Sequence, residues 1–351
     1  MTDTNIKPFA YDLPKVKIAA RPVKPYDSAK LLVLDRGTSS LEESIFSKIG
    51  NYLGENDVLV FNNTKVNKAR LFGTILGREK QVELLLLKQI SEDTWQCLAR
   101  PVKNLPPGTK VVFNSGLKAE IKERISEQVL EVIFSSDSGD IRPLLEEVAL
   151  MPIPPYIRDG LADSDDEDDY QSLFAENSGS IAAPTASLHF TPELIRSLED
   201  KKVGFEFLTL HIGMSSVRPL WDGNDSANLR NPGEEFFIFD MELMQRLLEH
   251  RANGKRIIAV GTTVVRALES MFAHEIDIPD GKELIPTSLF IKPGFKFQII
   301  DALITNFHFP ASTHLLLVQA LIGEFLLRGS YDYALENDFR FLSYGDGMLI
   351  L

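Results

Sequence analysis

Between about Leu71 and Ser136, the 351-residue chain changes from longer elements to a succession of short strand-type runs. Pro, Gly, Asn and Ser separate these runs, as in LPPGT and NSG. Short strands at this spacing are typical of a small barrel or sandwich. On either side, strand-type and helix-type segments alternate, which favours an α/β sheet covered on both faces. We therefore predict a mixed α/β fold, in which a large layered α/β domain (residues 1–70 and 143–351) carries an inserted small β-barrel domain (residues 71–142).

The larger domain has recognisable strands and helices. Strands are predicted at DVLVFN, FEFLTLHIG, RIIAVG and FQIIDALITNF, and helices at PELIRSLED, FDMELMQRLLEHR, TVVRALESMF and STHLLLVQALIGEFLL. A further helical stretch is predicted from about Leu41 to Leu53. Ligands of such sheets bind at the carboxyl ends of the strands. Polar residues that directly follow a strand are therefore the first candidates for a functional site.

Composition excludes several classes of protein. Cys97 is the only cysteine, which rules out an internal disulfide and a cysteine-based metal cluster. The N-terminal residues lack the pattern of a signal peptide, and no apolar run reaches the roughly 18 residues of a membrane span, so we expect a cytoplasmic protein. The net charge of −13 argues against indiscriminate binding of nucleic acid. The acidic run Asp163–Asp169 predicts a solvated or disordered loop.

The segment Gly179–Thr191, GSIAAPTASLHFT, is small, nearly uncharged and follows no amphipathic period. Small residues let a backbone approach a ligand closely, and Pro184 fixes a turn. Thr191 followed by Pro192 predicts the N-cap and first residue of a helix. A ligand-binding loop and a tight turn without a ligand both fit this composition.

Two strand-to-helix junctions carry polar residues. At RIIAVGTTVVRALES, the free N–H groups of a helix that opens with Thr262 and Thr263 favour an anion, although an ordinary threonine N-cap also fits. At LITNFHFPASTHLLLV, Asn306 and His308 emerge at a strand end, where a histidine bonded to the backbone of a turn is the alternative. His211 lies in an apolar strand, where a structural role is the commoner one.

Several cofactor patterns are absent from the sequence. No H-x-x-H, H-E-x-x-H or cysteine-containing metal motif occurs, so we expect no metal site. The G-x-G-x-x-G fingerprint and the G-x-x-x-x-G-K-[ST] loop are also absent, which disfavours NAD and nucleoside triphosphate chemistry.

An ordered set of motifs resembles one family. These motifs are YDLP, LLVLDR, LVFNNTKV-x-x-ARL, MPIPPYI, DYQSLFA, GSIAAPTASLHFT, TLHIG-x-x-x-x-RP, AVGTTVVRALES, LFIKPG, LITNFHFP-x-ST and FRFLSYGD. Together they resemble the S-adenosylmethionine:tRNA ribosyltransferase-isomerases of the queuosine pathway, from Tyr11 to Leu351. Each motif is modest alone, but the ordered set is highly specific.

The resemblance implies an activity. Such enzymes transfer and isomerise the ribosyl moiety of S-adenosylmethionine onto 7-aminomethyl-7-deazaguanine at the tRNA wobble position. Adenine and methionine leave, and epoxyqueuosine remains in the tRNA. The resemblance also implies an inserted β-barrel, S-adenosylmethionine as co-substrate, tRNA as partner, and neither a metal nor a permanently bound cofactor. We expect a monomer.

This sequence departs from the family pattern at several positions. Trp221–Phe237 reads WDGNDSANLRNPGEEFF, where the family carries His-x-Met-His. Arginines of the family pattern are replaced by Tyr26, Lys30 and Asp169, and a lysine is replaced by Ala311. The family's N-D-T-R reads N-N-T-K. Such changes leave two alternatives open: a diverged paralogue that uses S-adenosylmethionine on another 7-deazapurine or nucleoside, or a non-catalytic RNA-binding protein on the same fold.

The reaction implied by the resemblance needs groups that exchange protons near neutral pH, as histidine does. His189, His211 and His308 are the acid–base candidates, and Asp346 is the candidate that orients a histidine or a ribose hydroxyl. His314 stands where the family usually has an apolar residue and is not included. We expect His189, His308, Thr262 and Asp346 to face a common cavity.

Contacts to the substrates are predicted within the same motifs. Arg266 either binds an anion or pairs with Glu269. Arg70 either contributes to the same site or is a solvated charge at the end of a strand. The substrate-binding candidates are Asn62, Thr64, Arg70, Ser180, Pro184, Thr185, Gly261, Thr262, Thr263, Arg266, Asn306, Ser312, Thr313 and Tyr344. The candidates for contacts to tRNA phosphates are Lys65, Lys68, Lys292 and Lys296.

Overall fold

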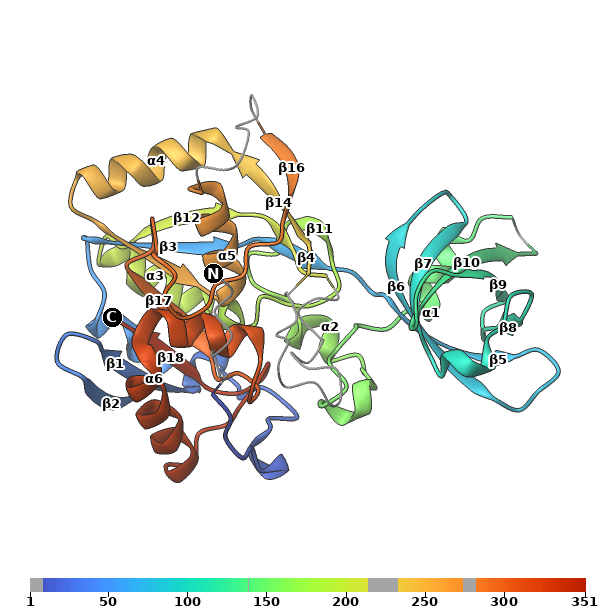
Figure 1. The fold of residues 1–351 in the computed structure, drawn as a ribbon, viewed down its shortest axis with the longest axis horizontal. Coiled ribbons are helices and arrows are strands. Elements are labelled where there is room, and N and C mark those ends of the chain that lie inside the picture. Colours follow the sequence, from blue (N-terminus) through green and yellow to red (C-terminus); the bar gives the residue numbers. More distant parts are fainter. Residues whose placement is uncertain (1–8, 138, 214–232, 274–281) are drawn as a thin grey trace.

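The computed structural model describes residues 9–137, 139–213, 233–273 and 282–351. Figure 1 shows a β-barrel at one end of the long axis and a layered arrangement of sheet and helices at the other. The C-terminus that the figure marks belongs to the layered part. The mixed α/β class predicted from the sequence is confirmed.

A seven-stranded sheet, counted over the described residues, forms the centre of the layered part. All six residues of its strand β3 are buried. Val58 and Val60 pack into the core on one face, whereas Leu59 and Phe61 pack into the core on the other, as the two-residue period of a strand requires. The strands in spatial order are β12 (Gly204–Leu208), β3 (Asp57–Asn62), β15 (Arg256–Val260), β17 (Ala302–Asn306), β18 (Gly347–Ile350), β1 (Lys30–Asp35) and β2 (Ser40–Ile45).

Helices cover both faces of this sheet. On one face, α4 (Met241–Ala252), α5 (Thr262–Met271) and α6 (Thr313–Glu336) contribute buried residues to a shared core. On the other face, α3 (Pro192–Asp200) and the 3₁₀ helix η3 (Phe46–Asn51) build a second core. The parallel strands β3, β15 and β17 at its centre are covered on both faces, which explains why they read as nearly continuous apolar runs.

The direction of the strands brings distant segments to one edge of the sheet. Strands β12, β3, β15 and β17 are mutually parallel, so their carboxyl ends meet at the same edge. Strand β18 runs antiparallel to β17, with Gly347 opposite Asn306. The loop that leads into β18 therefore lies beside the residues that leave β15 and β17.

A closed barrel forms from six strands between residues 70 and 136, a range that the structure describes throughout. It has its own core, in which Leu84, Val111 and Leu130 are completely buried. The predicted barrel is thereby confirmed, while the domain boundaries at residues 71 and 142 stay a prediction. Its strands around the barrel are β10 (Val129–Ser136), β7 (Thr94–Arg100), β6 (Gln81–Gln89), β5 (Arg70–Ile75), β8 (Lys110–Val112) and β9 (Leu117–Arg124).

Smaller elements connect these two bodies. Strand β4 (Thr64–Val66) pairs with β11 (Asn177–Ser180), and β14 (Glu235–Asp240) lies between β13 (Leu210–His211) and β16 (Lys282–Thr287). No helix in the described ranges is long and apolar enough to cross a membrane. The remaining helical segments are α1 (Arg142–Val148), α2 (Asp166–Asp169), η1 (Lys15–Lys17), η2 (Tyr26–Ser28), η4 (Val102–Asn104), η5 (Arg158–Gly160) and η6 (Thr185–His189).

The helix predicted from Leu41 to Leu53 is wrong. This stretch begins as edge strand β2 and continues as the 3₁₀ helix η3. Strand β2 pairs antiparallel with β1 along its whole length, from Lys30 opposite Ile45 to Asp35 opposite Ser40. Pairing with a neighbouring strand outweighs local helical preference, which is a weak determinant.

The acidic run is ordered and contains helix α2, so the predicted disorder is wrong, although five of its seven residues are exposed to solvent as predicted. Asp166 is completely buried and forms an ion pair with Arg158. Asp169 is buried too, with Lys24 Nζ at 2.9 Å and the Tyr26 hydroxyl at 2.8 Å from its carboxylate. Arg158, eight residues before Asp166, and Lys24, which is distant in the sequence, compensate these two carboxylates, as buried charges require.

Gly345 allows the chain to fold tightly before β18. A Cβ atom there would lie 2.5 Å from the backbone of Arg340 and Phe341. We expect Gly345→Ala to lower the free energy of unfolding by about 1–3 kcal/mol, because backbone atoms must move. Gly54→Ala is the control, since a Cβ atom at that position would meet nothing within 4 Å beyond its chain neighbours. Equal urea-unfolding midpoints for the two variants would contradict this account.

Candidate active site

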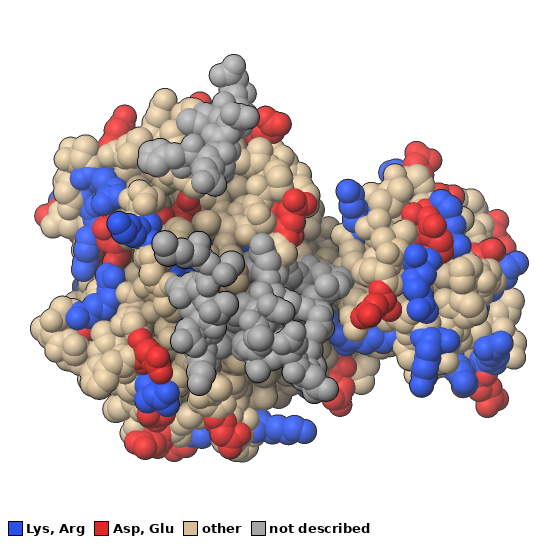
Figure 2. All heavy atoms as spheres, viewed as in Figure 1, with Lys and Arg blue, Asp and Glu red and all other residues tan. Residues whose placement is uncertain are grey.

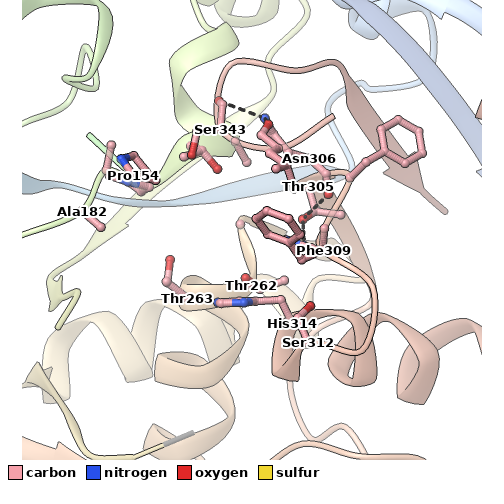
Figure 3. Close-up of a pocket in the computed structure, with 18 of the residues that line it drawn as sticks. Pro154, Ala182, Thr262, Thr263, Thr305, Asn306, Phe309, Ser312, His314 and Ser343 are labelled. Atoms are coloured by element: carbon pink, nitrogen blue, oxygen red, sulfur yellow. Dashed lines mark hydrogen bonds between the residues drawn. The ribbon is translucent and has the colours of Figure 1, made fainter. Parts of the chain in front are cut away.

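A cavity of about 440 Å³ lies at the carboxyl ends of β15 and β17. Figure 3 shows it enclosed by side chains from several elements. No Lys, Arg, Asp or Glu is among the described residues that line it. The lining comes mainly from five segments, at residues 154–156, 182–186, 261–263, 305–312 and 342–343.

The start of helix α5 forms one wall of the cavity. Gly261 is the N-cap, with a φ of 102° that favours glycine, and no side chain caps the helix. The threonine N-cap considered above is therefore wrong: Thr262 and Thr263 occupy the first turn and line the cavity. The Thr263 side chain hydroxyl is buried and has no hydrogen-bond partner among the described residues. The first N–H groups of a helix also lack intrahelical partners, so this wall favours an anion.

Helix α6 starts beside α5. Ser312 is its N-cap, and the Ser312 hydroxyl accepts a hydrogen bond from the N–H of Leu315 at 3.2 Å. Ser312 and His314 line the cavity, whereas Thr313 does not. Figure 3 shows Thr262 and Thr263 at the start of one helix and Ser312 and His314 at the start of the other, facing the same space. Two positive helix ends thus act on one cavity.

His308 lines the cavity and is held from three sides. Its Nε2 atom lies 2.9 Å from the Thr305 hydroxyl, so its ring bonds a side chain and not the backbone of a turn. The backbone N–H of His308 donates to the Tyr331 hydroxyl at 2.9 Å, and the backbone carbonyl of His308 accepts from the Tyr11 hydroxyl. Burial in the protein, followed by the neighbouring His314, holds the pKa of His308 well below its usual value. The imidazole is therefore uncharged at neutral pH.

His189 is buried behind the cavity and does not line it. Its ring stacks on Phe46 with centroids 4.5 Å apart, and its Nε2 atom lies 3.3 Å from Asn306 Oδ1. Asn306 does line the cavity, and its amide donates to the carbonyl of Leu342 at 3.0 Å. His189 therefore reaches the site only through Asn306. Burial lowers the pKa of His189 to about 4.

Four predicted residues form a separate polar cluster. The Thr64 hydroxyl lies 2.8 Å from the Ser180 hydroxyl and 2.9 Å from His211 Nδ1. Asn62 Oδ1 accepts from the N–H of Thr64 at 3.1 Å. None of the four lines the cavity, but Ser180 accepts from the N–H of Ile212, which does. The cluster fixes one wall of the site from behind.

The segment Gly179–Thr191 both lines the cavity and packs tightly against its neighbours. Pro184 and Thr185 line the cavity. Gly179, in contrast, makes room for a side chain, because a Cβ atom there would lie 2.6 Å from His211 Nδ1. The Thr191 hydroxyl accepts a bond from the first turn of α3, so the predicted N-cap is confirmed.

Arg266 and Arg70 are bound within the protein. Arg266 pairs with the buried Glu235 and donates to the Leu289 carbonyl at 3.2 Å, so its expected pairing with Glu269 is wrong. Arg70 is buried and not solvated, and it donates to the Gly160 carbonyl at 2.8 Å. Neither arginine lines the cavity.

The loop before β18 contributes its backbone and one serine to the site. Ser343 lines the cavity. The Tyr344 hydroxyl donates to Asp166 at 2.9 Å, and Asp346 accepts from the N–H of Lys30 at 3.0 Å and from the N–H of Arg340 at 2.7 Å. Of the four residues expected to face a common cavity, His308 and Thr262 do so, whereas His189 and Asp346 do not.

The four lysines predicted to contact phosphate lie outside the cavity. Lys65 and Lys296 are exposed, and Lys292 is half-buried. Lys68 Nζ lies 2.6 Å from Glu167 Oε1. The part of the Trp221–Phe237 segment up to residue 232 lies outside the described residues.

Sequence reasoning missed several residues of the cavity. Tyr156 and Phe309 form an edge-to-face pair with ring centroids 5.0 Å apart, and His314 lies at the start of α6. Both aromatic residues belong to motifs quoted above, MPIPPYI and LITNFHFP, so the signal was present in the sequence. No group of three or more His, Cys, Asp or Glu side chains in the described ranges is arranged to hold a metal ion.

His189 makes stability depend on pH. Its folded-state pKa of about 4 lies below the value near 6.5 expected in the unfolded chain. The stability that the buried, uncharged imidazole of His189 provides is therefore complete above about pH 6.5 and is lost as the pH falls toward 4. In wild type, we expect this residue to lower the free energy of unfolding by about 2–3 kcal/mol at pH 4.5 relative to pH 7. His189→Gln removes that part of the slope in urea titrations, and a slope as steep as that of wild type would contradict this account.

Comparison with known proteins identifies the family of the chain. A family model described as queuosine biosynthesis protein matches residues 6–350. The S-adenosylmethionine:tRNA ribosyltransferase-isomerase of Halothermothrix orenii is 38% identical over 346 residues, and that of Desulfitobacterium hafniense is 40% identical over 347, with 99% of each chain covered in both cases. The crystal structure of S-adenosylmethionine tRNA ribosyltransferase from Thermotoga maritima is 34% identical and gives a TM-score of 0.54, covering 98% of this chain and 99% of that one. The chain belongs to the queuosine biosynthesis protein family.

Proposed function

We propose that this chain is an S-adenosylmethionine:tRNA ribosyltransferase-isomerase. It transfers and isomerises the ribosyl moiety of S-adenosylmethionine onto 7-aminomethyl-7-deazaguanine at the tRNA wobble position, with release of adenine and methionine. The observation that carries the assignment is that one cavity joins an uncharged histidine, His308, to an unpartnered helix start at Thr262 and Thr263. An enzyme that acts on tRNA is expected to work in the cytoplasm, here as a monomer.

The start of α5 suits the carboxylate of S-adenosylmethionine. Its free N–H groups and the unpartnered hydroxyl of Thr263 are hydrogen-bond donors without protein acceptors. No lysine or arginine in the described residues lines the cavity, so backbone dipoles and hydroxyls replace a salt bridge. A carboxylate bound at this helix start needs no further positive group.

His308 suits the first proton transfer. The sulfonium charge acidifies the neighbouring carbon, and a base must remove a proton from it. The Thr305 hydroxyl also lies 3.3 Å from the carbonyl oxygen of Asn306, to which it donates its single proton. It then accepts from the Nε2–H of His308, which leaves Nδ1 unprotonated and able to take the proton. Of the three histidines predicted as acid–base candidates, only His308 is among the described lining residues.

The apolar side of the cavity suits the adenine. Tyr156 and Phe309 present aromatic surface there, beside Pro154 and Pro155. Flat aromatic groups pack well against such rings. Adenine held on this wall and the carboxylate held at α5 place the sulfur between them, near His308.

Binding of tRNA requires contacts to phosphate. Residues 71–142 hold ten Lys or Arg and ten Asp or Glu, so the remainder of the chain carries the whole net charge of −13. Figure 2 shows cations and acidic side chains interspersed over the barrel. We propose that the barrel faces the tRNA, because a surface of zero net charge repels a polyanion less than an acidic surface does. We also propose that phosphates are contacted by Lys65, Lys68, Lys292 and Lys296.

Replacing the proposed base tests the reaction. We expect His308→Gln to lower the turnover number by on the order of 10² to 10⁴-fold, because glutamine cannot take a proton. The assay follows adenine and methionine release and the mass of the modified nucleoside, with tRNA that carries 7-aminomethyl-7-deazaguanine. His250→Gln serves as the matched control and should retain full activity. A wild-type enzyme that releases adenine only with a free nucleoside would instead indicate the diverged paralogue.

The anion subsite is tested with a substrate that lacks the carboxylate. Thr263→Val preserves shape and removes the hydroxyl, so we expect roughly tenfold weaker binding of S-adenosylmethionine. Decarboxylated S-adenosylmethionine should bind wild type and variant with equal affinity in calorimetry. An equal loss for both compounds would show that the hydroxyl does not contact the carboxylate.

A further inference from the structure

His314 places a second imidazole in the cavity, directly against the first. It lies in the first turn of α6, and its ring stacks on that of His308 with centroids 5.2 Å apart and planes inclined by 20°. Figure 3 shows His314 facing the space between Thr262 and Phe309. Stacked rings present faces to one another, so a direct hydrogen bond between these two imidazoles is excluded.

We infer that His314 is a positioning residue: its ring covers that of His308 and keeps water from it, so that His308 stays uncharged and the cavity accepts a sulfonium cation. This inference rests on the proposed function, because it concerns the substrate that the cavity binds. It assigns to His314 an effect on charge, exerted through His308, and no proton transfer of its own.

The surroundings of the two rings support this role. Two imidazoles at this distance do not both carry a charge, because like charges repel strongly inside a protein. The positive end of α6 opposes a charge on His314. Burial lowers the pKa of both histidines, and the presence of His314 lowers that of His308 further.

The other titratable groups nearby do not reverse this effect. Glu235 on β14 attracts a proton to His314, but it is paired with Arg266 on α5, which repels one. Around His308, burial raises the pKa of Tyr11 and Tyr331, so both hydroxyls stay uncharged at neutral pH. No Lys, Arg, Asp or Glu lines the cavity in the described ranges. The protonation of the histidine pair therefore sets the charge that a ligand meets.

An uncharged pair matters for a cationic ligand. A positive charge about 6–12 Å from a sulfonium would weaken its binding by roughly one to two orders of magnitude at an effective dielectric constant near 20. The neutral thioether S-adenosylhomocysteine shares the remaining groups of the ligand and is insensitive to that charge. The two compounds thus separate an effect of charge from an effect of shape.

The first experiment measures the protonation of His308 directly, without substrate. Imidazole NMR signals of the full-length enzyme are followed from pH 8 downward in wild type, His314→Gln and His250→Gln. We expect His308 to take up its proton at a higher pH in His314→Gln, by roughly half a pH unit or more, because glutamine covers less of the ring and takes up no competing proton. His250→Gln should match wild type. An unchanged titration of His308 in His314→Gln would overturn the inference.

The second experiment places a charge at the same position. In His314→Lys at pH 7.5, we expect binding of S-adenosylmethionine to weaken at least tenfold, whereas S-adenosylhomocysteine changes less than threefold. Binding of the thioether also reports that the variant is folded, and His314→Asn, which adds no charge, should bind both compounds. Equal losses for both compounds in His314→Lys would assign only a packing role to this residue. A wild-type enzyme that binds neither compound would refute the proposed function, while the NMR titration still decides the role of His314.

Discussion

The site depends on the direction of four neighbouring strands. Because β3, β15 and β17 are parallel, the chain leaves them at one edge of the sheet. Because β18 runs antiparallel, the chain enters it at that same edge, with Gly347 opposite Asn306. Hydrogen bonding between backbones thus fixes where the helix starts, the histidine and the loop at Ser343 meet. A shift of register by one residue in any of these strands would turn its end residues away from the cavity.

Burial, more than ion pairing, determines the chemistry at this edge. The charged groups near the cavity are compensated behind it: Arg266 by Glu235, and Asp166 by Arg158. The surface that faces the cavity offers hydroxyls, imidazoles, aromatic rings and free backbone N–H groups. This division explains how a chain of net charge −13 provides a cavity that no described Lys, Arg, Asp or Glu side chain lines.

Much of this arrangement was predictable from the sequence, because local signals encode it. The turn residues and short runs indicated the barrel, and Thr262, Thr263, Asn306 and His308 stood out because they follow apolar strands. The remainder depends on partners far away in the chain. Strand β2 is formed by pairing with β1, and Asp169 of the acidic run is buried beside the distant Lys24. The family pattern led attention to His189 and away from His314, whose place beside His308 only the fold reveals.

The attachment of the barrel has a consequence for how such a protein diversifies. The outgoing and returning chains are joined at Arg70 and Leu150, which exchange two backbone hydrogen bonds of 3.1 and 2.8 Å. The described strands between these residues form the closed barrel, and none of them belongs to the main sheet. Insertions, deletions or wholesale replacement of that module leave the geometry around the cavity intact. With the barrel in its proposed role toward tRNA, natural selection can therefore alter recognition of the macromolecule and the chemistry of the cavity one at a time.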